Sequence, residues 1–182
     1  MTSGDIDDKL ESAEWLVELR EGNAEFNAYL IKAWQFRPVR TFFIPFGAGI
    51  SEDGQRVYIS HDIQTIIDGV ECENALVRHE TTEWALRKFC SIGVDYLTDP
   101  SGHRLANRAE HDRVMELLAR ENGWELYEEI INPQVILDER EEFEDLPIPQ
   151  DLALYPYEDV IANNLYSAMR NERSKEEWDK IS

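Results

Sequence analysis

Cysteine is scarce in this chain of 182 residues, which contains only Cys72 and Cys90. Their spacing excludes a Cys-x-x-Cys motif, and their number excludes a disulfide framework. Two free thiols are typical of a protein in a reducing compartment. We therefore expect a cytoplasmic protein whose two thiols pack in the core.

Long apolar runs are missing as well. No stretch of the chain approaches the ~20 apolar residues that a membrane-spanning helix needs. Residues 1–12 are acidic and lack the apolar segment of a secretory signal peptide. These two absences predict a protein that does not associate with a membrane.

Basic residues are few, because 18 Lys and Arg stand against 38 Asp and Glu, giving a net charge of −20. A field of this sign repels phosphate backbones, so nucleic acid is not an expected partner. It attracts cations or a basic protein, and an acidic decoy that mimics nucleic acid is an alternative. The chain also contains no Gly-rich phosphate loop and no Gly-x-Ser-x-Gly nucleophile motif.

The first third of the chain has a helical pattern followed by strands. Residues 5–36 carry apolar side chains at helical spacing, with a break at Gly22. β-branched and aromatic residues predict strands at Val39–Phe46 and Gln55–Ser60. With turn residues at Ser51–Gly54, the two strands are expected to form an antiparallel hairpin.

The rest of the chain is predicted to be mainly helical. Asn122-Gly123 is a helix stop signal, and an acidic run at 138–145 indicates a linker. The expected helices are Glu73–Ser91, Ser101–Asn122, Trp124–Ile131 and Tyr157–Arg173.

These elements predict an α+β fold that is mostly helical, with a short antiparallel hairpin or small sheet beside a pair of site helices. We expect residues 1–137 to form one core domain that includes a site region at 55–118. Residues 138–182 are expected to form an acidic linker and a C-terminal helix.

The helix predicted at Glu73–Ser91 places polar residues on its apolar side. At about 100° per residue, one apolar arc is defined by Cys72, Leu76, Leu86 and Cys90. His79 and Glu83 fall inside this arc, one turn apart, and Glu80 lies at its edge. Thr81 points elsewhere.

The helix predicted at Ser101–Asn122 shows the same feature. Its apolar arc is defined by Ala106, Val114, Leu117 and Leu118. His103 and Glu110 fall in the middle of the arc, whereas His111 lies at its margin. Each helix thus aims one imidazole and one carboxylate at the core.

A buried ionised carboxylate is unfavourable unless it is paired or bound to a metal. If the two helices pack together, four side chains converge: His79, Glu83, His103 and Glu110. Such a set suits a divalent transition metal, most naturally zinc, with iron or manganese as alternatives. A metal-free network of buried hydrogen bonds among the same side chains is the competing interpretation.

Residues 79–83, HETTE, resemble the HExxH motif of the zincin metallopeptidases, with Glu83 in place of the second His. The wider pattern is HExxE, then Tyr96, then HxxAxxxE from His103 to Glu110. It looks like a group of uncharacterised bacterial and phage-associated proteins with a zincin-like arrangement. The resemblance covers residues 55–118.

The resemblance implies a zincin-like core in which His79 binds zinc and Glu80 is the general base that activates a water. Glu83, His103 and Glu110 would be the remaining candidate ligands. The loss of the second His is a departure that weakens the inference of peptidase activity. A site with two imidazoles and two carboxylates could also be closed, and hence structural.

Three functions are compatible with these observations. The first is a metal-dependent, peptidase-like hydrolase acting on an unidentified substrate. The second is a non-enzymatic, phage-associated or partner-binding acidic domain with a structural metal. The third is an acidic decoy or a phage structural component that binds no metal. Whether the four side chains converge in space is the first observation that separates them.

Overall fold

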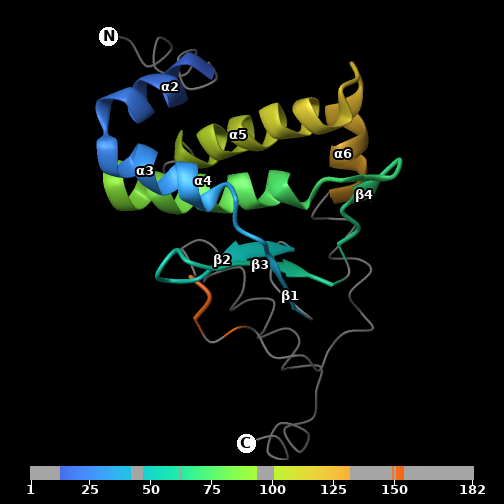
Figure 1. Cartoon of the computed structure of the whole chain (residues 1–182), viewed down its shortest axis with the longest axis horizontal. Helices are drawn as coiled ribbons and strands as arrows, with labels where there is room; N and C mark the ends of the chain where they lie inside the picture. The colour runs from blue at the N-terminus through green and yellow to red at the C-terminus, as the bar shows by residue number, and fades with distance from the viewer. Residues whose placement is uncertain are drawn as a thin grey trace, which may run out of the picture.

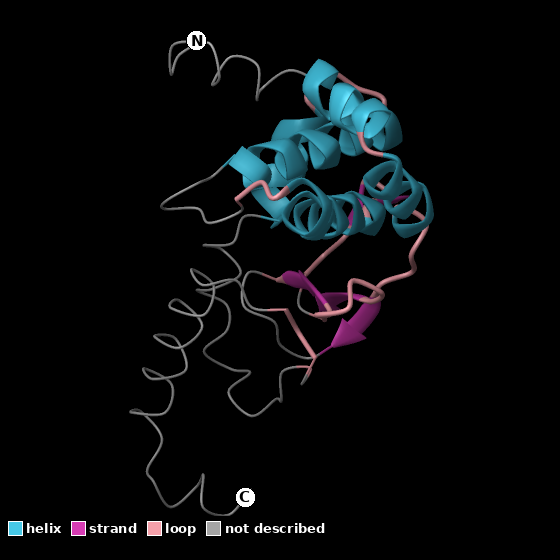
Figure 2. Ribbon diagram, turned by 90° about the vertical axis from the view of Figure 1, so that its left-hand side faces the viewer, coloured by secondary structure: helices cyan, strands magenta, loops and turns pink. Residues whose placement is uncertain are grey.

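The computed structural model describes residues 13–41, 47–61, 63–93, 101–131, 149 and 151–153. Within these ranges the fold is α+β and mostly helical, as predicted. Figure 1 shows the helices on one side of a small sheet, and Figure 2 shows the same two layers from the side. Five predicted features lie outside the described residues: the start of the first helix at 5–12, the end of the first strand at 42–46, Tyr96, the acidic run at 138–145 and the helix at 157–173.

The N-terminal helical region divides into α2 (Ala13–Gly22) and α3 (Ala24–Ala33), as the predicted break requires. Asn23 lies between them and caps α3, because its side-chain oxygen accepts a hydrogen bond from the N–H of Phe26 at 3.0 Å. α3 then buries Phe26 and Leu30 completely against the site helices.

The main sheet has three strands, β1 (Val39–Thr41), β2 (Ala48–Ile50) and β3 (Val57–Ser60), in the order β1-β3-β2. β1 runs parallel to β3, whereas β2 is antiparallel to it. The predicted hairpin between Val39–Phe46 and Gln55–Ser60 is therefore wrong, since the antiparallel partner of β3 is β2.

β2 was not predicted because alanine and glycine have low strand propensity. All three of its residues are nevertheless buried, and β2 and β3 both contact α4. The predicted turn at Ser51–Gly54 is present. Its geometry is set by the hydroxyl of Ser51, which accepts hydrogen bonds from the N–H groups of Gln55 and Arg56 at 3.1 and 3.0 Å.

A short segment from the region expected to be linker and C-terminal helix joins this sheet. Leu152 forms an antiparallel bridge with Ser51 next to β2. The carboxylate of Asp151 accepts hydrogen bonds from Arg56 at 2.6 Å and from the hydroxyl of Tyr58 at 2.8 Å. The segment is thus attached by backbone and side-chain bonds.

An unpredicted second hairpin is formed by β4 (Ile66–Ile67) and β5 (Val70–Glu71). Asp68 and Gly69 connect them with φ angles of 49° and 82°. Positive φ at both positions is typical of a type I′ turn, for which Asp-Gly is a common sequence. The flanking strands are too short to show an alternating pattern.

α4 (Glu73–Cys90) matches the first predicted site helix and lies at the centre of the molecule. It contacts α3 and α5 as well as β2 and β3. Thr81, which was expected to point away from the apolar arc, is fully buried and donates a hydrogen bond to the carbonyl of Val77 at 2.6 Å. A helical wheel assumes a single buried face, whereas α4 is covered by helices and by the sheet.

α5 (Ser101–Leu118) and α6 (Gly123–Ile131) follow. The prediction that α5 continues to Asn122 is wrong, because Ala119 adopts a left-handed conformation with φ of 49°. Alanine gives no sequence signal for the left-handed residue that ends a helix. Asn122-Gly123 does give such a signal, but in the structure it marks the start of α6.

Gly54 provides a test of how tightly α4 packs on the turn between β2 and β3. Its φ is 69°, and a Cβ there would lie 2.5 Å from the ring of Trp84. Gly54→Ala should therefore combine backbone strain with a clash and lower the free energy of unfolding by about 2–4 kcal/mol.

Gly69→Ala is the matched control, because Gly69 has a φ of 82° but nothing within 4 Å of its Cβ position. Only backbone strain should lower its free energy of unfolding, by about 1–2 kcal/mol. Denaturant unfolding of both variants measures the difference. Equal losses would show that the contact with Trp84 contributes nothing.

Candidate metal centre

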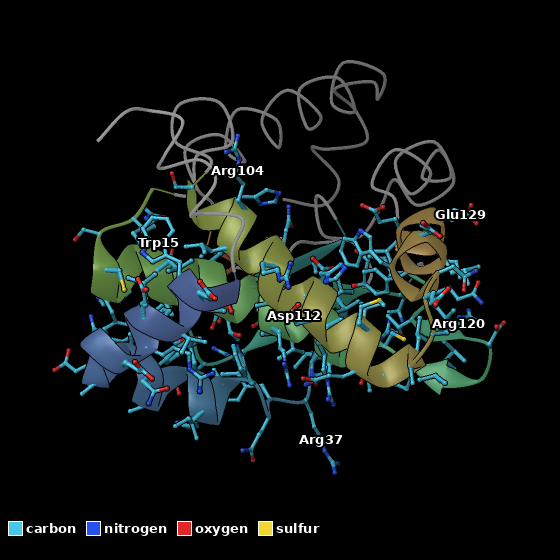
Figure 3. All side chains as sticks on the ribbon, turned by 90° about the horizontal axis from the view of Figure 1, so that it is seen from above. Trp15, Arg37, Arg104, Asp112, Arg120 and Glu129 are labelled. Carbon is cyan, nitrogen blue, oxygen red and sulfur yellow. The ribbon has the colours of Figure 1, made fainter. Side chains whose placement is uncertain are left out.

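α4 and α5 lie along each other and carry all the predicted site residues. In Figure 3, α5 crosses the view from Arg104 near its start, past Asp112, towards Arg120, which lies just beyond its end. Glu129 marks α6 at that same end. The site is therefore built between two neighbouring helices, with α6 beside the end of α5.

His79, Glu83 and His103 form a compact group in which one ligand atom of each lies within 4.8 Å of the others. Nε2 of His79 is 3.8 Å from Oε1 of Glu83. Nδ1 of His103 donates a hydrogen bond to the same oxygen at 2.7 Å. The two imidazole rings meet edge to face, with centroids 5.0 Å apart. The structure thus brings three of the four predicted ligands together.

Glu110 approaches His79 from another direction. Its Oε2 accepts a hydrogen bond from Nδ1 of His79 at 2.7 Å. Because Nδ1 and Nε2 point to different sides of the ring, Glu110 is separated by the imidazole from the space between His79, Glu83 and His103. Glu110 was predicted to bind the metal directly. In the structure its carboxylate is hydrogen-bonded to His79, which is itself a candidate ligand.

Tyr127 of α6 completes the network and was not singled out from the sequence. Its hydroxyl donates a hydrogen bond to Oε1 of Glu110 at 2.6 Å, and the residue is almost fully buried. Burial and the adjacent charge of Glu110 raise the pKa of Tyr127 well above its usual value, so the hydroxyl keeps its proton. A tyrosine at helical spacing is normally assigned to core packing, and no sequence signal reveals the partner of its hydroxyl.

The environment of His79 strongly favours its protonated form. Burial alone lowers the pKa of His79, but the charge and hydrogen bond of Glu110, followed by the charges of Glu83 and Glu80, raise it to about 10. Without a metal, the imidazolium neutralises the surrounding carboxylates. A metal ion at Nε2 would take the place of a proton. Glu80 is partly buried beside His79 on α4.

The donor set could hold a metal ion, and the group, whose ligand atoms lie within 4.8 Å of one another, must contract to reach the dimensions of a tetrahedral site. Bonds of about 2.0–2.1 Å in a tetrahedral site place neighbouring ligand atoms about 3.4 Å apart. The 3.8 Å between His79 and Glu83 is close to this value, whereas the 2.7 Å hydrogen bond between His103 and Glu83 must open slightly. The side chain of His103 is 30% exposed, which gives the group a route to solvent.

The remaining histidines and the cysteines lie outside this group. His111 packs its ring against Trp124, with centroids 5.0 Å apart, and His61 is exposed. Both cysteines are free thiols, of which Cys72 is buried and Cys90 half-buried. The expectation of a core thiol therefore holds fully for Cys72.

Comparison of the chain with protein-family models, with curated proteins and with solved structures found no match. None of the helices in the described ranges is long and apolar enough to cross a membrane. The function proposed below is therefore inferred from the chemistry of the site, together with the resemblance of residues 79–83 to the zincin motif.

Substitutions in the His79–Glu110 pair test how much the site contributes to the free energy of unfolding in the absence of metal. His79→Leu would leave Glu110 as a buried carboxylate without its cationic partner. We expect this change to lower the free energy of unfolding by about 3–5 kcal/mol in the presence of a chelator.

The double variant His79→Leu/Glu110→Leu removes both charges. Its free energy of unfolding should fall less than that of His79→Leu alone, because no unpaired charge remains. Denaturant unfolding in EDTA measures both values. A double variant that loses as much stability as His79→Leu alone, or more, would contradict the coupling.

Proposed function

We propose that this protein binds one divalent transition metal ion, most naturally zinc, through His79, Glu83 and His103. The observation that carries the proposal is the 4.8 Å clustering of one ligand atom from each residue. Two imidazoles and one carboxylate match the protein ligands of catalytic zinc sites, which leave a fourth position for water. Iron and manganese accept similar ligands and are alternative ions.

Electrostatic balance supports the same ligand set. A divalent ion bound by two neutral imidazoles and the carboxylate of Glu83 would carry one net positive charge. The carboxylate of Glu110, in contact with His79, would neutralise it. Both carboxylates are nearly buried, at 4% and 7% exposure, and so need such compensation.

We further propose that the site is that of a metal-dependent, peptidase-like hydrolase with Glu80 as its general base. A bound zinc ion lowers the pKa of a coordinated water to about 7. Glu80 adjoins His79 in sequence and is close enough for its charge to raise the pKa of that residue. A carboxylate in this position is suited to accept the proton of the water. The resemblance of HETTE to the zincin motif supports the same assignment.

A metal-free polar network is the second candidate, and one specific observation favours it. The hydrogen bonds from His103 to Glu83 and from His79 to Glu110 pair both buried carboxylates without any ion. In that case the polar network would join the two helices alongside their apolar packing, and the acidic surface would serve a protein partner.

Metal content distinguishes the two candidates. Protein purified without an affinity tag, loaded with zinc and freed of excess, should contain about one equivalent by mass spectrometry. The variant His79→Ala/Glu83→Ala should contain none, because two of three ligands are lost. His111→Ala is the control and should keep its zinc, since His111 lies outside the group. A wild-type protein that retains no metal supports the polar network instead.

Glu80→Gln tests the hydrolase proposal separately. If the wild-type protein cleaves fluorescein-labelled casein, the variant should lose at least about 100-fold in rate, because the proton acceptor is gone. Its zinc content should not change. Retained cleavage by Glu80→Gln would contradict the role of Glu80 while leaving the metal site intact.

A further inference from the structure

We propose that Glu110 and Tyr127 are positioning residues that hold the ring of His79 so that its Nε2 faces Glu83 and His103. This inference rests on the metal site proposed above and gives Glu110 a different role from that of a ligand. It also makes α6, which contributes no candidate ligand, part of the functional site.

The first step of the argument concerns the two oxygens of Glu110. Oε2 accepts a hydrogen bond from Nδ1 of His79 at 2.7 Å, and Oε1 accepts one from the hydroxyl of Tyr127 at 2.6 Å. Both bonds are short and buried, so solvent does not compete for them. The carboxylate is therefore held from two sides and has a defined orientation.

The second step concerns the imidazole. A carboxylate can only accept hydrogen bonds, so Nδ1 of His79 carries the proton and Nε2 is the atom available to a metal. That nitrogen faces Oε1 of Glu83 at 3.8 Å. A carboxylate behind a metal-binding histidine fixes the ring and strengthens it as a ligand, and loss of such a partner commonly lowers metal affinity about 10–100-fold.

The third step explains why residue 127 is a tyrosine. Its ring stacks on Trp124, with centroids 5.5 Å apart, and packs in a core cluster with Ile63 and Ile67. Phenylalanine would preserve this packing but would leave Oε1 of Glu110 without its buried donor. The hydroxyl therefore acts on Glu110 and, through it, on His79.

The experiment compares the full-length wild-type protein with Tyr127→Phe, Glu110→Gln and a control, Tyr29→Phe. Tyr29 is a suitable control because its hydroxyl also makes one internal hydrogen bond, to the carbonyl of Gly54 at 2.8 Å, away from the site. For each protein we would measure zinc affinity by competition with a chromophoric chelator, the visible spectrum of bound Co²⁺, and thermal stability in EDTA.

We expect Glu110→Gln to weaken zinc binding by about 10–100-fold and Tyr127→Phe to weaken it less, in the same direction. Both should shift the Co²⁺ bands, because His79 is no longer held in one orientation. Tyr29→Phe should lower thermal stability yet keep the affinity and spectrum of the wild type.

Two results would overturn the proposal in different ways. If Tyr127→Phe loses stability as Tyr29→Phe does but keeps wild-type zinc affinity and Co²⁺ bands, its hydroxyl is only structural. If the wild-type protein binds neither zinc nor Co²⁺, the metal site itself is wrong, and the positioning role fails with it.

Discussion

Two crossed histidine–carboxylate pairs between α4 and α5 are the contacts on which the arrangement of the site depends. His79 of α4 pairs with Glu110 of α5, and His103 of α5 pairs with Glu83 of α4. A sliding movement or a rotation of either helix would separate both pairs at once and leave buried charges uncompensated. The pairs therefore oppose any change in the register of the two helices, in addition to the apolar packing between them.

The two pairs are unequal, and the difference bears on what the site can do. The His79 side is enclosed by Glu110 and Tyr127, whereas the side chain of His103 remains 30% exposed. One imidazole is therefore enclosed, whereas the other, although hydrogen-bonded to Glu83, is partly open to solvent. A ligand group with one enclosed side and one solvent-facing side offers an ion an approach from the His103 side.

The sequence predicted the convergence of three candidate ligands better than it predicted the sheet. His79, Glu83 and His103 could be found because polar residues on an apolar helical arc are conspicuous. Tyr127 could not, since a buried tyrosine fits any core and its partner lies 17 positions away. The antiparallel pairing of β2 was obscured by its Ala-Gly composition, because its strand conformation depends on burial beneath α4 and hardly on local propensity.

The segment at residues 151–153, which lies beside β2, affects the tendency of the protein to aggregate. An outer strand presents unpaired N–H and C=O groups that can recruit a strand from another molecule. Here Leu152 bridges to Ser51, and the backbone N–H of Glu52 donates to the carbonyl of Asp151 at 2.8 Å. The chain thus covers part of its own β2 edge, and like-charge repulsion between acidic molecules adds a second barrier to edge-to-edge aggregation.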